Sequence, residues 1–250
     1  MSIRWSFGAV VGFALPIATS FPLAAQEQHA AGMLVMPPMM DTAVFVHGVL
    51  DQFEGRIGGA NAFRWSGEAW VGGDRDKLWL KSEGFALGRG RVEDGRHEFL
   101  YDRAISAYVD LQAGVRTDWD SGTGRTWAAL GVEGLAPLFF KYEATAYLSD
   151  RGHAAAHLAA SYDLMITQSL ILQPLVELNF YSKADPGRGV GAGLSDIDAG
   201  LRLRYEITRK FAPYIGIAYA GKFGETARMA RQANEASGSL QFVIGIRSWF

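Results

Sequence analysis

Four of the chain's seven methionines lie within eight residues, in the stretch MLVMPPMM at 33–40. Thioether sulfur is a soft ligand, so such a cluster could hold a soft metal ion. Methionine also fills gaps in protein cores, but the two prolines and the missing helical or strand period disfavour a buried element here. The stretch is therefore either a soft-metal site or an ordinary tail.

The residues ahead of this cluster have the composition of a secretory signal peptide. Residues 1–25 contain one early arginine, an apolar run over residues 7–17 and small residues at Ala24 and Ala25. A membrane anchor would need a longer apolar run, and Pro16 interrupts this one. We therefore predict a cleaved signal peptide at 1–25, a flexible methionine-containing segment at 26–42, and a folded domain at 43–250.

Composition excludes several classes of function. The chain has 24 Lys and Arg against 26 Asp and Glu, so it has no basic field for nucleic acid. It contains no cysteine, which rules out zinc fingers, disulfide frameworks and thiol catalysis.

Alternating apolar and polar residues replace long apolar runs after residue 26. One example is 138–149, where Lys141, Glu143, Thr145 and Tyr147 oppose an apolar face. Such segments are about ten residues long, which is the length of a tilted strand that crosses a bilayer. Twelve strands are predicted, starting near Val44, Phe63, Lys77, Arg96, Tyr108, Arg125, Leu138, His153, Ser169, Asp196, Phe211 and Ser239. This pattern predicts an all-β, antiparallel, up-and-down transmembrane barrel.

The connections support the same architecture. Short turns are predicted at 72–76, 105–107, 136–137, 165–168 and 207–210, and longer loops at 85–95, 182–195 and 222–238, with short exceptions at WDSGTG and DRG. Short periplasmic turns and longer outer loops are typical of outer-membrane barrels, so we predict a periplasmic amino terminus. A soluble sandwich or lipocalin-like barrel also alternates, but it lacks this arrangement of loops.

Charged residues fall on the inward face of the predicted strands. They are Glu68, Lys81, Glu83, Glu133, Lys141, Glu143, Glu177, Arg202 and Arg204. They could form a cation path or a second metal site, but the balance of signs favours ion pairs that fill a small lumen. His153 and His157 share a face but lie about 13 Å apart along a strand, which is too far for one ion and favours a polar lumen.

Several stretches resemble the outer-membrane copper resistance protein B family, from about Val46 to Phe250. They are LDQFE at 50–54, WSGEAWVGGDRDKLWLKSEG at 65–84, YDRAIS at 101–106, DLQAGVR at 110–116, RTWAALGVEGLAP at 125–137, EATAYLSD at 143–150, LILQPLVELN at 170–179, GLSDIDAGLRLRYEITRKFAPY at 193–214 and the closing FVIGIRSWF. The closing phenylalanine resembles the assembly signal of bacterial outer-membrane barrels. The resemblance covers most of the mature chain.

This resemblance implies an outer-membrane protein of copper tolerance that binds copper ahead of its barrel. The implied copper ligands, suited to Cu(I), are Met33, Met36, Met39 and Met40, with His29 or His47 as an imidazole supplement. Other family members carry a longer region with Met and His in repeats, so the single cluster here leaves affinity and stoichiometry open. Implied partners are outer-membrane lipid, the barrel-assembly machinery through the last strand, and a periplasmic multicopper oxidase.

Two other functions remain open from the residues alone. A general small-solute pore would need no methionine cluster. Some twelve-strand barrels are phospholipases, but no GxSxG pattern is present and nothing singles out a catalytic triad. We therefore predict a non-enzymatic outer-membrane protein that sequesters or transfers copper ions.

Overall fold

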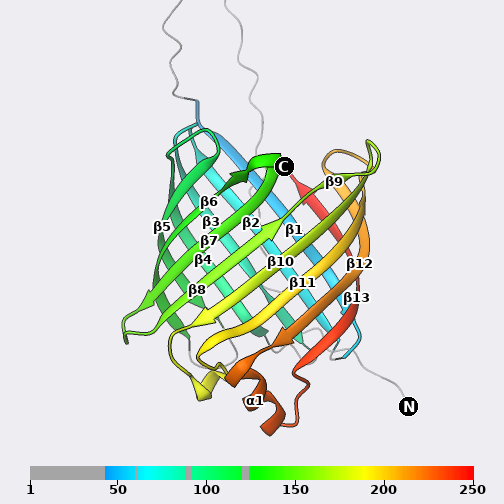
Figure 1. Ribbon diagram of the computed structural model, residues 1–250. Helices are drawn as coiled ribbons and strands as arrows, with labels where there is room; N and C mark the ends of the chain where they lie inside the picture. The colour runs from blue at the N-terminus through cyan, green and yellow to red at the C-terminus, as the bar shows by residue number, and fades with distance from the viewer. Residues whose placement is uncertain (1–42, 60, 88–91, 120–123) are drawn as a thin grey trace, which may run out of the picture. The chain divides into compact units, whose positions relative to one another are not determined.

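The computed structural model describes residues 43–59, 61–87, 92–119 and 124–250. These residues form one antiparallel sheet that closes on itself, because β1 pairs with both β2 and β13 (Figure 1). The strands are β1 (Phe45–Ile57), β2 (Ala62–Gly72), β3 (Asp76–Leu87), β4 (Val92–Ala104), β5 (Val109–Asp118), β6 (Arg125–Ala136), β7 (Phe140–Ser149), β8 (Ala154–Ser161), β9 (Leu164–Met165), β10 (Leu170–Tyr181), β11 (Gly193–Tyr205), β12 (Phe211–Lys222) and β13 (Gly238–Trp249). Because β8 and the two-residue β9 both pair with β10 along the same side, the barrel has twelve strands, as predicted.

One predicted loop is much shorter than expected. Residues 85–95 were predicted as a loop, but β3 runs to Leu87 and β4 begins at Val92 rather than near Arg96. The stretch is rich in glycine and charge, which is typical of loops. Its flanks nevertheless pair across a register shift, with Phe85 opposite Glu93 and Ala86 opposite Val92. Backbone pairing therefore continues past the point where the apolar alternation ends.

The barrel is polar inside and apolar outside. Charged and amide side chains such as Glu54, Arg56, Asp102, Gln112 and Arg202 are buried within it. The exposed outer surface carries large apolar side chains, among them Val115, Leu130, Leu148, Ile215, Ile217, Phe242 and Ile244. In a soluble protein the apolar side chains lie inside, whereas here they face outward, as expected for a barrel with lipid outside and a polar lumen. No described helix is long and apolar enough to cross a membrane.

The two ends of the barrel differ in their connections. We call the end with residues 73–75, 105–108, 137–139, 166–169 and 206–210 the turn end; β1 begins there and β13 ends there. The opposite loop end has the connections that follow β1, β3, β5, β7, β10 and β12. Its two longest connections contain the 3-10 helix η3 (Pro186–Arg188) and the helix α1 (Gly224–Gln232), and α1 lies at the opposite end from β9 (Figure 1). A further 3-10 helix, η2 (Pro137–Phe139), lies at the turn end.

The last residue helps to close the barrel. Phe250 and Gly48 exchange two backbone hydrogen bonds, each with an N···O distance of 3.0 Å. A Cβ atom on Gly48 would lie 2.5 Å from the tip of the Phe250 ring, so a larger residue at position 48 would require that ring to move. The carboxy-terminal phenylalanine is thus fixed against the first strand, at the seam between β1 and β13.

Candidate functional site

Most of the predicted metal ligands lie outside the described residues. These ligands are His29, Met33, Met36, Met39 and Met40. The sixth, His47, lies in β1 near the turn end.

The half-buried ring of His47 lies next to two tryptophan rings. The ring centroids of Trp70 and Trp249 are each 5.7 Å from the His47 centroid. Lys77 Nζ lies 5.7 Å from the Trp70 centroid, and Lys210 Nζ lies 5.5 Å from the Trp249 centroid. Among the described residues, neither nitrogen of His47 has a hydrogen-bond partner, so the imidazole is available to a ligand.

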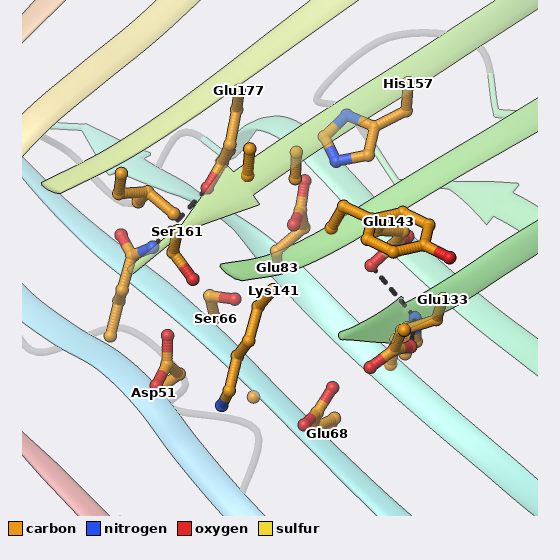
Figure 2. A pocket seen from close by; sticks show the side chains of 18 of the residues that line it. Asp51, Ser66, Glu68, Glu83, Glu133, Lys141, Glu143, His157, Ser161 and Glu177 are labelled. Carbon is orange, nitrogen blue, oxygen red and sulfur yellow. Dashed lines mark hydrogen bonds and ion pairs between the residues drawn. The ribbon is translucent and has the colours of Figure 1, made fainter. Parts of the chain in front are cut away.

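A cavity of about 390 Å³ occupies the lumen from its middle to the turn end. Its wall carries carboxylates from eight strands: Asp51, Glu68, Glu83, Glu98, Asp110, Glu133, Glu143 and Glu177. The cationic side chains in the wall are Lys81, Arg96 and Lys141. Figure 2 shows carboxylates facing the cavity from β1, β2, β3, β6, β7 and β10.

Lys81 is the centre of the hydrogen-bonded cluster in this wall. Its ammonium donates to Glu133 Oε2 at 2.7 Å, Glu143 Oε2 at 3.0 Å and Gln112 Oε1 at 3.1 Å. Glu68 is its pairing partner on β2 and interacts with it electrostatically, but makes no hydrogen bond or ion pair within the described chain. The Lys81 ammonium is therefore the counter-ion shared by the carboxylates of Glu68, Glu133 and Glu143.

A layer of arginines separates this cavity from the loop end. We define the arginine layer as Arg56, Arg64, Arg116 and Arg202 with Glu54, Asp118 and Asp198. Its first hub is the fully buried Glu54, which accepts hydrogen bonds from Arg56 at 2.8 Å, Arg202 at 2.9 Å and the Tyr214 hydroxyl at 2.9 Å. Arg56 also pairs with Asp198.

The second hub of the arginine layer is Asp118. It accepts from Arg116 at 2.6 Å, from Trp127 Nε1 at 2.8 Å and from Arg188 at 2.9 Å. Trp127 and Asp118 are each only 1% exposed, so water is excluded here.

The arginine layer contacts cavities on both sides. Arg64 pairs with Glu177, which lines the large cavity. Arg188, bound to Asp118, lines a cavity of about 280 Å³ at the loop end. These two cavities share no wall residue. Buried ion pairs therefore lie in the lumen between them, and the balance of charges predicted such pairs.

His157 and His97 lie in separate environments within the described barrel. His157 is buried and contacts Arg96 Nη2 at 3.1 Å and Asn179 Oδ1 at 2.9 Å. This agrees with the prediction that it belongs to a polar lumen. His97 packs against the Trp119 ring, with centroids 5.2 Å apart. In the part of the chain that the structure describes, no three His, Asp or Glu side chains converge as a preformed metal site.

Three carboxylates of the cavity wall are not among the inward-facing charged residues predicted from the sequence. Glu98 and Asp110 follow the strand alternation and could have been found from it. Asp51 could not, because a bulge in β1 shifts the pairing register between Leu50 and Gln52 and places two neighbouring residues, Asp51 and Gln52, in the cavity wall.

Comparison with known protein families and relatives gives consistent matches. A family model described as "Copper resistance protein B precursor (CopB)" matches residues 44–250. The chain is 44% identical over 227 residues to the copper resistance protein B of Escherichia coli, which covers 90% of this chain and 76% of that protein. It is also 44% identical over 211 residues to a copper resistance protein B homolog of Pseudomonas syringae pv. tomato (strain ATCC BAA-871 / DC3000), covering 84% of this chain and 71% of that protein.

Solved structures show a similar fold. The NanC porin aligns with a TM-score of 0.52 and 13% identity, covering 81% of this chain and 98% of that one. At this identity the likeness concerns the barrel fold alone, which fits an outer-membrane location.

Proposed function

The chain belongs to the copper resistance protein B family, and from that premise we propose that it binds copper ions on the segment 26–42 and transfers them to the turn end of its barrel. Its role in copper resistance follows from the family. Binding and transfer are the proposed mechanism for that role. No bond of a substrate is made or broken, so the protein acts as a carrier rather than an enzyme.

The proposed copper ligands are Met33, Met36, Met39 and Met40, with His29 or His47 as the nitrogen ligand. Thioethers select Cu(I) over harder cations because soft ligands match a soft ion. The spacing MxxMxxMM allows several sulfur atoms to reach one ion. Cu(I) is thus the oxidation state we propose for the bound ion.

The observation that carries the proposal is the position of His47. It lies seven residues after Met40, at the turn end, and its ring nitrogens have no hydrogen-bond partner among the described residues. A half-buried imidazole held between Trp70 and Trp249 has a fixed orientation, so less freedom is lost when it binds an ion. His47 would therefore receive copper where the barrel begins.

The same proposal includes an orientation and partners. We place the turn end and the amino terminus in the periplasm, because short turns face that side in outer-membrane barrels. A periplasmic multicopper oxidase is the proposed exchange partner, and the barrel-assembly machinery is proposed to recognise the last strand together with Phe250, which follows it.

A general solute pore is the main rival function. It would need a water-filled path from end to end. The arginine layer disfavours that path, since its buried ion pairs lie between the two cavities. The likeness to a porin concerns fold only and gives this rival no further support.

The test is Cu(I) binding by the full mature chain, folded in detergent and titrated against a chromophoric Cu(I) chelator. A variant changing Met33, Met36, Met39 and Met40 to Leu should lose the high-affinity ion. The matched control is Met165→Leu, which removes a thioether outside the cluster and should bind as wild type does. Equal binding by all three proteins would rule out the methionine cluster as the copper site.

A further inference from the structure

We propose that the large lumen cavity is a second, separate cation site, which holds a hydrated divalent cation by its carboxylates without stripping the ion of water. This site does not depend on the methionine segment. It would collect divalent cations, Cu(II) among them, at the turn end of the barrel.

The charge of the cavity wall is the first support. Eight wall carboxylates face three wall cations, which are Lys81, Arg96 and Lys141. Three cations outside the wall each pair with one wall carboxylate: Arg64 with Glu177, Lys77 with Asp110, and Arg247 with Asp51. Carboxylates remain in excess, so the cavity attracts a positive ion.

The second support is a buried carboxylate oxygen without a partner. Glu98 lines the cavity and is 2% exposed. Its Oε1 atom accepts the Tyr147 hydroxyl at 2.6 Å, but its Oε2 atom has no hydrogen-bond partner. A buried carboxylate is costly unless its charge is compensated, so a cation in the adjoining cavity would stabilise Glu98.

The third support is the arrangement around Lys81. Its pairing partners on both neighbouring strands are glutamates, Glu68 on β2 and Glu98 on β4. The Glu133 and Glu143 carboxylates and the Gln112 amide oxygen already surround its ammonium at 2.7–3.1 Å. The protein's own ammonium thus occupies a position suited to a cation. A divalent ion beside it would neutralise Glu68.

The hydrated form of the ion follows from size and geometry. No three acidic or histidine side chains among the described residues converge closely enough to bind a bare ion directly. The cavity of about 390 Å³ is large enough for an ion with its first water shell, since a water occupies roughly 30 Å³. Binding through water makes the site weak, fast and sensitive to salt.

The experiment uses Mn(II) as the probe, because it prefers oxygen ligands and its free form gives a sharp paramagnetic resonance signal. The full mature chain in detergent should reduce that signal, and hexaamminecobalt(III) should compete, since its ammine shell does not exchange and it can bind only as an intact complex. Glu68→Gln should weaken Mn(II) binding about five-fold, and Lys81→Gln should tighten it about ten-fold, because these changes alter the net charge of the site in opposite directions.

The control is the four-methionine variant, which should bind Mn(II) as wild type does. Because Glu68 makes no described hydrogen bond or ion pair, Glu68→Gln should fold normally, and heat-modified electrophoretic mobility checks this for each variant. Failure of wild type to bind, equal binding by Glu68→Gln, or unchanged or weaker binding by Lys81→Gln would overturn the proposal. Loss of Mn(II) binding in the four-methionine variant would show that this site depends on the methionine segment. If hexaamminecobalt(III) did not compete with Mn(II), the ion would not be bound in its hydrated form.

Discussion

Glu133 and Glu143 lie directly opposite each other on β6 and β7, and one ammonium, that of Lys81, bridges them at 2.7 and 3.0 Å. Like charges opposite each other on neighbouring strands repel, so the pair depends on this third strand. Lys81 therefore ties β3 to β6 and β7 across the lumen.

Replacing Lys81 with methionine should destabilise the folded barrel. The change leaves two facing carboxylates without their counter-ion, at an expected cost of about 1–3 kcal/mol in the free energy of unfolding. Urea unfolding in lipid vesicles measures this. The double variant Lys81→Met with Glu133→Gln should recover most of the loss, because the repulsion is gone. No recovery would show that the lysine acts through packing alone.

Removing the Glu54 carboxylate should lower the free energy of unfolding more than replacing Lys81 does. Glu54 is fully buried and binds Arg56, Arg202 and Tyr214. Glu54→Ala therefore leaves the buried Arg202 without a counter-charge and Arg56 with Asp198 alone. Breaking a buried ion pair costs about 3–5 kcal/mol. Glu225→Ala is the control, since its ion pair with Arg228 in α1 is partly exposed and worth less than about 1 kcal/mol. Similar losses in both variants would contradict this account of the arginine layer.

Much of the barrel is predictable from the sequence, because lipid on one side and a polar lumen on the other impose a strict period of two. The strand starts at Arg125 and Phe211 were predicted at the observed residues. Interactions across the lumen cannot be predicted from this period. Lys81 and Glu143 are 62 residues apart in the sequence, and they come into contact only because the barrel closes.

Local departures from this period of two could not be predicted from the sequence either. The bulge at Asp51 in β1 and the break between β8 and β9 both depend on how neighbouring strands register, which alternation along one strand does not encode. Of the predicted copper ligands, only His47 lies within the described barrel; the methionine cluster remains a prediction.

The wild-type protein should show no large, steady conductance in planar lipid bilayers, because the buried ion pairs of the arginine layer lie between the two cavities of the lumen. Changing both Glu54 and Arg202 to alanine removes the centre of that layer and should produce measurable current steps. A large steady conductance in wild type would favour the pore function instead. No current in either protein would place the barrier elsewhere in the barrel.

The proposed orientation can be tested by single-cysteine labelling, since the chain has no cysteine of its own. Arg151→Cys lies at the loop end and should react with a membrane-impermeant maleimide on intact cells. Ser106→Cys lies at the turn end and should react only after the outer membrane is permeabilised. Both positions are exposed, so a difference in labelling reports the side of the membrane. The reverse pattern would place the amino terminus outside.

The most direct test of the central claim is X-ray absorption at the copper edge of the Cu(I)-loaded full chain. We expect a shell dominated by sulfur with one nitrogen neighbour. In His47→Phe, which keeps a ring between Trp70 and Trp249, the sulfur shell should remain; the nitrogen signal should disappear if His47 is the nitrogen ligand and persist if His29 is. A shell of oxygen and nitrogen without sulfur would contradict copper binding by the methionine cluster.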